Sequence, residues 1–377
     1  MTKRAFVGFA GFGGVDIALR EAGYDVVGVE LGDEIAAVAR ANGHNTITAD
    51  ILDIDPRNYA GWDLMHFSPP CPNFSLAKVG REESETDLAL ARKIVQFIEA
   101  QPEIFTLENV YRYRNSQSWT MIAEALRRMG YGFDYWNLNS ADYGVSQTRR
   151  RMIVIARRDG ELVRKPTPTH RDPSKGCAFQ MTMLDRLPPW RGWYAAIEDL
   201  IPTLPDSNFA EWQLKRLPEE LVDSMLVMTG NTNLIETDAV SGRGWLEKKR
   251  PANTVSTVSN GSMPRAFLVS DIDGTIRESE KPSTTVLAKE NGGNVPRAYL
   301  LGQGERSTPI ADDAPAQTRR PARALVQGRV VSMTPRALAR FQDFPDSYEL
   351  PDKNALACKG IGNAVPVGLY QAVLRSI

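Results

Sequence analysis

The sequence has few cysteines and histidines, and its charges nearly cancel. The chain of 377 residues holds three of each, and the cysteines lack the paired spacing of a zinc site or a disulfide framework. So few thiols suit a reducing cytoplasm, which is the location we expect. A net charge of −1 argues against nucleic-acid binding by the whole surface, so any such binding must come from local patches such as 147–158.

Long apolar runs are also missing. No run approaches the ~20 residues that cross a membrane, so a membrane is not an expected partner. The first 14 residues start basic and turn apolar, but glycines and Asp16 interrupt the run and no cleavage site follows. We interpret this stretch as a buried first strand, in a chain long enough for about two domains.

Strand and helix patterns alternate through residues 1–160, which indicates an α/β fold with a doubly wound, mostly parallel sheet. Ligands of such sheets bind beyond the carboxyl ends of the strands. Strands are expected at 4–10, 25–31, 45–51, 62–68 and 104–110, helices at 15–23, 33–43, 87–101 and 119–130, and a closing hairpin at 133–139 and 150–156.

The pattern changes in residues 161–330, which are rich in Pro, Gly, Ser and Thr. Segments 250–269 and 281–301 match in order and type, and 314–338 is a weaker third copy, each typical of strand, turn and strand. We therefore expect a smaller, irregular β-rich domain over 161–330. Residues 331–377 return to helical spacing, with Thr334 as an N-cap before Pro335, and rejoin the first domain.

Three successive strand ends carry groups suited to a nucleoside. The glycines of FAGFGG, Phe9–Gly14, allow a tight turn that opens a helix N-terminus. Glu30 follows the second strand, where a carboxylate suits a ribose diol, and Asp50 follows the third. Each could simply cap a helix. Together, without a phosphate-binding lysine, they favour an adenosyl cofactor over a triphosphate.

A cysteine and a glutamate follow the next two strands. Cys71, in FSPPCPNFS, sits in a stiff frame of prolines, which favours a reactive role over a small buried filler. Glu108, in LENV, has apolar neighbours in sequence, and burial among them would keep a proton available on its carboxyl. A surface glutamate before a loop is the alternative.

One reaction uses a thiolate, a protonatable carboxyl and an adenosyl donor together. Cytosine C5 is too poor a nucleophile to attack a sulfonium methyl group. Addition of a thiolate at C6 makes C5 nucleophilic, and protonation of N3 assists the addition. Methyl transfer follows, and loss of the C5 proton then expels the thiolate.

These motifs, in this order, resemble the DNA (cytosine-5)-methyltransferases over most of the chain. The resemblance implies a Rossmann-like class I methyltransferase domain and a target-recognition domain at 161–330. It makes Cys71 the nucleophile and Glu108 the group on N3, and it implies that Arg149 reaches the cytosine O2. It further implies that Gln147, Arg149 and Arg151 of QTRRR are structural and base-contacting, that Ser75 contacts DNA, and that the cofactor residues are Phe9, Gly11, Gly13, Glu30, Asp50, Pro70, Asn363 and Ala364.

The resemblance also implies partners. S-adenosyl-L-methionine would be the cofactor, S-adenosyl-L-homocysteine its product, and double-stranded DNA the substrate, with the cytosine flipped out of the helix. We expect a monomer in a bacterial or phage-infected cytoplasm, with a cognate restriction endonuclease as a possible partner but no stable complex. The sequence departs from the family pattern at three places without removing a required chemical group: Pro72-Asn73 replaces Gln-Pro, Val7 replaces Asp, and Met65 replaces a smaller branched residue.

Other functions stay open at this point. A tRNA cytosine-5 methyltransferase of the same family is the nearest, although the long insert favours DNA. A non-catalytic DNA-binding relative should have lost Cys71 or Glu108, and a nicotinamide oxidoreductase would need a different glycine spacing. Arg265 and Arg297 occupy equivalent places in the two matching segments, so we hypothesise that they approach DNA from adjacent loops, with solvated turn residues as the alternative.

Overall fold

The structure is a computed structural model that describes residues 2–70, 83–172, 187–205, 266–269, 276–278, 297–300 and 330–377. Cys71, Ser75 and Arg265 lie outside these ranges. The described residues fall into two compact units, one formed by residues up to 191 together with 338–377 and the other by the residues between them. These limits differ from the predicted domain boundaries at 160 and 331. Among the described helices, none is long and apolar enough to span a membrane.

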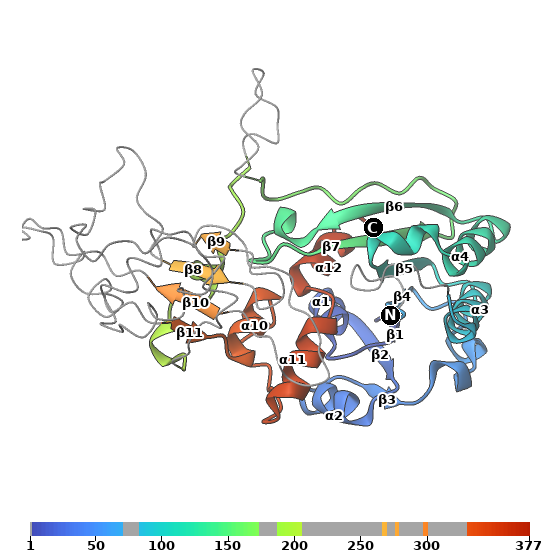
Figure 1. Ribbon diagram of the computed structural model, residues 1–377. Coiled ribbons are helices and arrows are strands. Elements are labelled where there is room, and N and C mark those ends of the chain that lie inside the picture. The colour runs from blue at the N-terminus through green and yellow to red at the C-terminus, as the bar shows by residue number, and fades with distance from the viewer. Residues whose placement is uncertain are drawn as a thin grey trace, which may run out of the picture. The chain divides into compact units, whose positions relative to one another are not determined.

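A seven-stranded sheet forms the centre of the first unit (Figure 1). The order is β3-β2-β1-β4-β5-β7-β6, and β7 runs antiparallel between β5 and β6 while the other neighbours are parallel. The predicted doubly wound, mostly parallel sheet and its closing hairpin are thus confirmed. The strands are β1 (Lys3–Gly8), β2 (Tyr24–Glu30), β3 (Thr46–Thr48), β4 (Leu64–Phe67), β5 (Ile104–Asn109), β6 (Gly132–Asn139) and β7 (Arg150–Arg157).

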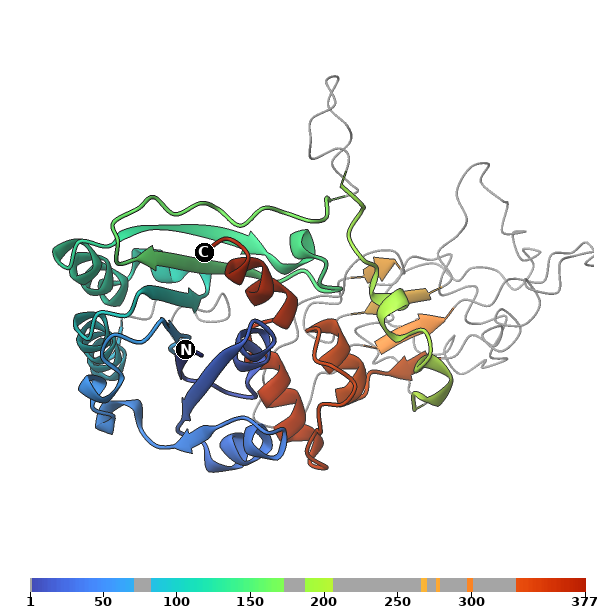
Figure 2. The same ribbon diagram turned by 180° about the vertical axis from the view of Figure 1, so that it is seen from behind.

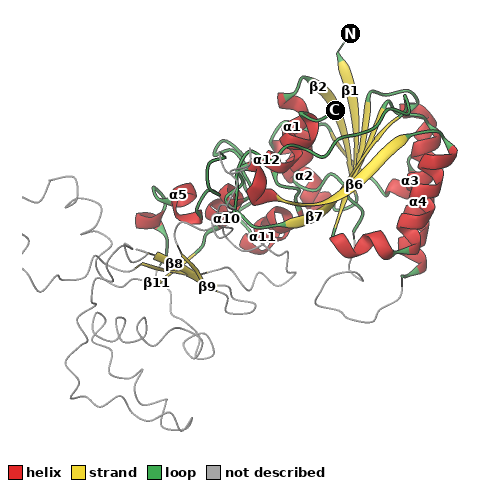
Figure 3. Cartoon of the chain, turned by 90° about the horizontal axis from the view of Figure 1, so that it is seen from above, coloured by secondary structure: helices red, strands yellow, loops and turns green. Residues whose placement is uncertain are grey.

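Helices cover both faces of this sheet. Figure 3 shows α3 (Glu85–Glu99) and α4 (Gln117–Arg128) on one side, with α1 (Gly14–Glu21), α2 (Asp33–Ala41) and α12 (Val367–Leu374) on the other. Helices α10 (Pro335–Phe341) and α11 (Asn354–Asn363) precede α12 in the chain. Short 3-10 turns lie at Ile51–Asp53, Pro56–Tyr59, Tyr111–Asn115, Ser140–Tyr143 and Ile201–Thr203.

The central strands are buried on both faces, one of which carries apolar side chains and the other buried polar side chains. Met65, Phe67, Phe105 and Leu107 alternate along β4 and β5 and pack into the aromatic and aliphatic core beneath α3 and α4. The residues between them, including His66, Thr106 and Glu108, are polar yet buried, and they face the opposite side. Groups that can carry chemistry are therefore gathered on the side that also holds α12.

Helix α11 is not among the predicted elements. Its sequence, NALACKGIGN, contains two glycines, which weaken a helical pattern. Gly360 has a packing reason, since a Cβ there would lie 2.2 Å from the ring of Phe12. Gly360 thus weakens the helical pattern in the sequence, and it also allows α11 to approach the glycine turn after β1.

The second unit contains a four-stranded antiparallel sheet of order β11-β10-β8-β9 and a short helix, α5 (Trp193–Ile197). Thr334 caps α10 as predicted, accepting a hydrogen bond from the backbone N–H of Ala337 at 3.4 Å. The strands are β8 (Ala266–Val269), β9 (Ile276–Glu278), β10 (Arg297–Leu300) and β11 (Val330–Ser332).

The two best-matched repeat segments supply neighbouring strands, β8 and β10. Their register is antiparallel, so Arg297 pairs with Val269, whereas Ala266, the residue after Arg265, pairs with Leu300. Ala266 and Arg297, the first residues of the two strands, therefore lie at opposite ends of the strand pair. Arg265 lies outside the described residues, so the hypothesis that Arg265 and Arg297 approach DNA from adjacent loops stays a prediction.

A buried carboxyl in α1 gives a testable dependence of stability on pH. Asp16 is 1% exposed, and neither of its oxygens has a hydrogen-bond partner in the described part of the chain. Burial raises its pKa from 3.8 to about 7. The folded state therefore holds this proton more tightly than the unfolded state, and its stability falls as pH rises from about 4 to about 7.

We expect the Asp16→Asn variant to gain up to about 4 kcal/mol over the parent protein at pH 8, with the gain vanishing near pH 4. Urea unfolding at both pH values measures this difference. Asp25→Asn, which removes an exposed carboxyl at the start of β2, is the matched control. A gain of equal size at pH 4 and pH 8 would contradict the assignment.

Candidate active site

The glycine turn after β1 is shaped by left-handed backbone conformations. Phe9, Gly11 and Gly13 have φ values of 63°, 57° and 76°. A Cβ on Gly11 would meet nothing within 4 Å, so the turn faces open space there. Gly14 was not predicted as a site residue, yet a Cβ on it would lie 2.3 Å from the carbonyl oxygen of Val365. The pair Gly13-Gly14 is the sequence feature that could have indicated this close approach of two backbone segments.

Glu30 is tied to the glycine turn. Its Oε2 accepts a hydrogen bond from the Gly11 N–H at 3.0 Å, and its Oε1 accepts one from the Gly32 N–H at 2.9 Å. Asp50, at the next strand end, accepts from the Leu52 N–H at 2.9 Å and caps a 3-10 turn. Both carboxylates are half-buried and retain lone pairs for a ligand. The structure thus brings these groups to one edge of the sheet, as the sequence predicted.

The C-terminal segment closes onto the same turn. Figure 2 shows α12 beside α1, although more than 300 residues separate them in the chain. Ala364 is buried against Gly14, whereas Asn363 is exposed at the end of α11. Farther back, the Tyr348 hydroxyl donates to the carbonyl oxygen of Phe12 at 2.6 Å. Residues 362–366 therefore form one wall of the site around the glycine turn.

The segment leading to Cys71 is anchored on both sides. The backbone N–H of Ser68 donates to the carbonyl of Gly8 in β1 at 3.4 Å, and the side chain of Asn109 donates to the carbonyl of Pro69 at 3.1 Å. Pro69 is buried and Pro70 is exposed. The chain therefore leaves the sheet between β1 and β5 at the edge that carries Glu30.

Glu108 is buried, as predicted, but its partner is a cation rather than apolar residues alone. The carboxylate is 7% exposed, and its Oε1 lies 2.9 Å from Nε of Arg151. Arg151 is near the start of β7, which pairs with β5 and places Glu108 opposite Ile153. The pairing of β5 with β7 thus brings Glu108 of LENV and Arg151 of QTRRR together as an ion pair.

Arg149 and Gln147 are both buried in the structure. Arg149 is 3% exposed and donates from Nη1 to the carbonyl of Gly362 at 3.0 Å. Its guanidinium thus contacts the C-terminal segment, and the contact of Arg149 with a cytosine O2 stays a prediction. Gln147 is fully buried, and its side-chain amide makes no hydrogen bond with the described residues, so its contact with DNA stays a prediction.

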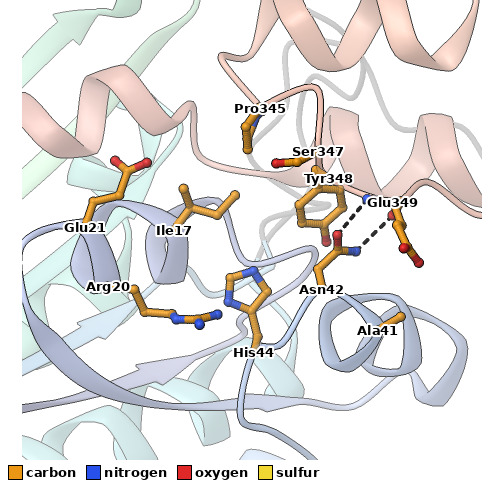
Figure 4. Close-up of a pocket in the computed structure, with 10 residues that line it drawn as sticks. All are labelled: Ile17, Arg20, Glu21, Ala41, Asn42, His44, Pro345, Ser347, Tyr348 and Glu349. Atoms are coloured by element: carbon orange, nitrogen blue, oxygen red, sulfur yellow. Dashed lines mark hydrogen bonds between the residues drawn. The ribbon is translucent and has the colours of Figure 1, made fainter.

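A separate pocket of about 570 Å³ lies beside α1 and α2. Figure 4 shows Arg20, His44 and Tyr348 among its lining residues, and reciprocal hydrogen bonds between Asn42 and the backbone of Glu349 close one side. Of the described residues that line it, none is a predicted site residue. Burial lowers the pKa of His44 to about 4, so this imidazole is neutral near pH 7.

Comparison with known proteins agrees with this geometry. A model of the C-5 cytosine-specific DNA methylase family matches residues 8–377. Type II methyltransferase M1.HphI of Haemophilus parahaemolyticus is 24% identical, with 98% of this chain and 85% of that protein covered. Type II methyltransferase M.AgeI of Thalassovita gelatinovora is 23% identical, with 98% and 97% covered.

Among solved structures, the Dnmt2 methyltransferase of S. pombe shares the fold, with a TM-score of 0.53, 15% identity and coverage of 99% of this chain and 96% of that one. The family match extends from the end of β1, through α12, to residue 377, and it includes every strand end described above. The chain belongs to the C-5 cytosine-specific DNA methylase family.

Proposed function

We propose that this protein transfers a methyl group from S-adenosyl-L-methionine to C5 of a cytosine in double-stranded DNA, through a covalent bond between Cys71 and C6. The observation that carries the proposal is the buried Glu108–Arg151 pair. It lies beside the anchored segment that leads to Cys71, since Asn109, next to Glu108, holds Pro69. A carboxylate and a guanidinium placed together can read the polar edge of one base.

The residues around the glycine turn fit the cofactor. The open space at Gly11 admits a ligand close to the backbone, and Glu30 is held where its oxygens can accept from a ribose diol. Phe9 and Asp50 would hold the adenine, and residues 362–366, with Asn363 and Ala364, would close the far side of the cofactor site. When bound, S-adenosyl-L-methionine supplies an electrophilic methyl group on a sulfonium centre.

The chain's own groups perform the remaining steps. The thiolate of Cys71 adds to C6, and the electron pair of the C5–C6 double bond moves through the ring as Glu108 supports protonation at N3. The resulting enamine makes C5 the methyl acceptor. Removal of the C5 proton then restores the double bond and expels the thiolate.

The arginine assignment follows the geometry. Arg151, 2.9 Å from Glu108, is the arginine that can also donate to the cytosine O2. Arg149 instead acts as a structural clamp on Gly362. The proposal therefore assigns to Arg151 the O2 contact that the resemblance implied for Arg149.

Recognition of the target sequence falls to the region between residues 192 and 337, which contains the four-stranded sheet of the second unit. The cytosine must leave the duplex for Cys71 to reach C6. Several relatives are named Type II methyltransferases, whereas one from Bacillus phage SPR is named an orphan methyltransferase. The proposal therefore includes a monomeric enzyme in the cytoplasm that can act with a cognate restriction endonuclease but forms no stable complex with it.

Methylation of a plasmid in vitro tests the function. With tritiated methyl donor, we expect label to enter duplex DNA, and bisulfite sequencing should place 5-methylcytosine in one short recurring sequence. A parallel reaction with tRNA distinguishes the nearest alternative. Label in tRNA alone would show the RNA activity, and label in neither acceptor would favour a non-catalytic DNA-binding protein.

A further inference from the structure

A chain of buried hydrogen bonds joins β4, β5 and α12 behind the candidate site. The hydroxyl of Ser68 lies 2.7 Å from Nε2 of His66, and Nδ1 of His66 lies 2.9 Å from the hydroxyl of Thr106. Thr106 in turn lies 2.8 Å from the hydroxyl of Tyr370 on α12. The rings of His66 and Tyr370 also meet edge to face, with centroids 4.8 Å apart.

This network is costly to bury and fully satisfied. His66 is 1% exposed, and Thr106 and Tyr370 are 0% exposed. Burial lowers the pKa of His66 to about 3, so its ring is neutral, with one nitrogen donating and the other accepting. Apolar residues fill the other positions of β4 without this desolvation cost. Because the polar side-chain atoms of His66, Ser68, Thr106 and Tyr370 all have partners within the network, it fixes one arrangement of β4, β5 and α12.

The position of the network connects it to the reacting groups. Ser68 stands three residues before Cys71, and the two intervening residues, Pro69 and Pro70, have fixed φ angles that transmit its placement. Thr106 stands two residues before Glu108 on the same face of β5. His66 and Thr106 are direct partners in the parallel β4–β5 register. One imidazole thus links the strand that leads to the nucleophile with the strand that carries the acid.

We propose that His66, with Ser68, Thr106 and Tyr370, forms a positioning network that sets Cys71 relative to Glu108. The inference rests on the proposed function. These residues act through the backbone and do not touch the base, so their loss should slow thiolate addition without weakening cofactor binding. A misplacement of about 1 Å at a reacting centre can slow chemistry by ~10²-fold.

Two nearly shape-preserving variants test the network, Thr106→Val and Tyr370→Phe. The readout is the single-turnover rate of the covalent adduct with a 5-fluorocytosine duplex, together with the Kd of the methyl donor and the urea midpoint. We expect Thr106→Val, which breaks the chain at its centre, to slow adduct formation by ~10- to 100-fold with the Kd unchanged. Tyr370→Phe, at the end of the chain, should have a smaller effect in the same direction.

Rescue and control variants separate positioning from general packing. His66→Gln can still reach Ser68 and should form the adduct faster than His66→Leu. Tyr131→Phe is the matched control, because Tyr131 is buried and its hydroxyl donates to the carbonyl of Pro102 at 2.6 Å, at the opposite end of β5. It should retain the parent rate.

Parent-like adduct rates in both Thr106→Val and His66→Leu would overturn the inference. So would a loss of rate matched by an equal loss of donor affinity, since that would indicate only structural damage. Absence of the adduct in the parent protein would instead contradict the proposed function itself.

Discussion

The Cys71→Ala variant is expected to lose methyl transfer by roughly 10⁴-fold or more while it continues to bind S-adenosyl-L-methionine. Without the sulfur, no electron pair enters the ring at C6, and C5 remains too poor a nucleophile. The residues that surround the glycine turn are untouched, so the Kd of the cofactor should not change. Transfer of tritiated methyl groups to plasmid DNA and calorimetric titration of the cofactor measure the two quantities.

Cys358→Ala provides the control for this experiment. Cys358 is half-buried on α11, and burial raises the pKa of its thiol, which makes it a weak nucleophile. Its removal should leave methylation at the parent rate. Methylation by Cys71→Ala at a rate near that of the parent would eliminate the covalent mechanism.

Glu108→Gln is expected to lower the single-turnover rate by about 10²- to 10⁴-fold. The amide has the same shape as the carboxyl but cannot exchange a proton with N3 of the base. It also leaves Arg151 without the carboxylate that lies 2.9 Å from its Nε. Because the defect arises in the ring-activation step, adduct formation with a 5-fluorocytosine duplex should slow to the same extent as methyl transfer.

Glu103→Gln makes the same change at the other end of β5. Glu103 faces Arg158 at 3.7 Å, but both side chains are largely exposed, at 58% and 41%. Such surface pairs contribute about 0–1 kcal/mol, so neither rate should change. Equal rates in Glu108→Gln and the parent protein would show that Glu108 is not the proton donor.

Much of the site could be predicted from sequence because parallel strands end at one edge. Once β1, β2 and β5 were recognised from their apolar runs, the glycine turn, Glu30 and Glu108 had to lie near one another. The contact of Glu30 with the glycine turn and the burial of Glu108 both follow from the positions of these residues at the ends of strands in one sheet. No knowledge of side-chain contacts was needed for this part.

The roles of the arginines could not be obtained in the same way. Arg149 lies in the turn before β7, and its backbone N–H donates to side chains of Asn139 and Ser140. No strand periodicity governs such a residue, so the sequence does not say which way it points. Its partner, Gly362, is more than 200 residues away, a contact that only the folded chain defines. The buried pairing of His66 with Thr106 likewise depends on the register of β4 and β5.

The contact between Gly14 and Val365 has a consequence for synthesis of the protein. About 350 residues separate the two partners, and a ribosome adds roughly 5–20 residues per second. The glycine turn therefore emerges roughly 20–70 s before the segment that covers it has been made. During that interval the nascent protein lacks one wall of the site around the glycine turn, so it becomes competent to modify DNA only after residues 362–366 have been synthesised.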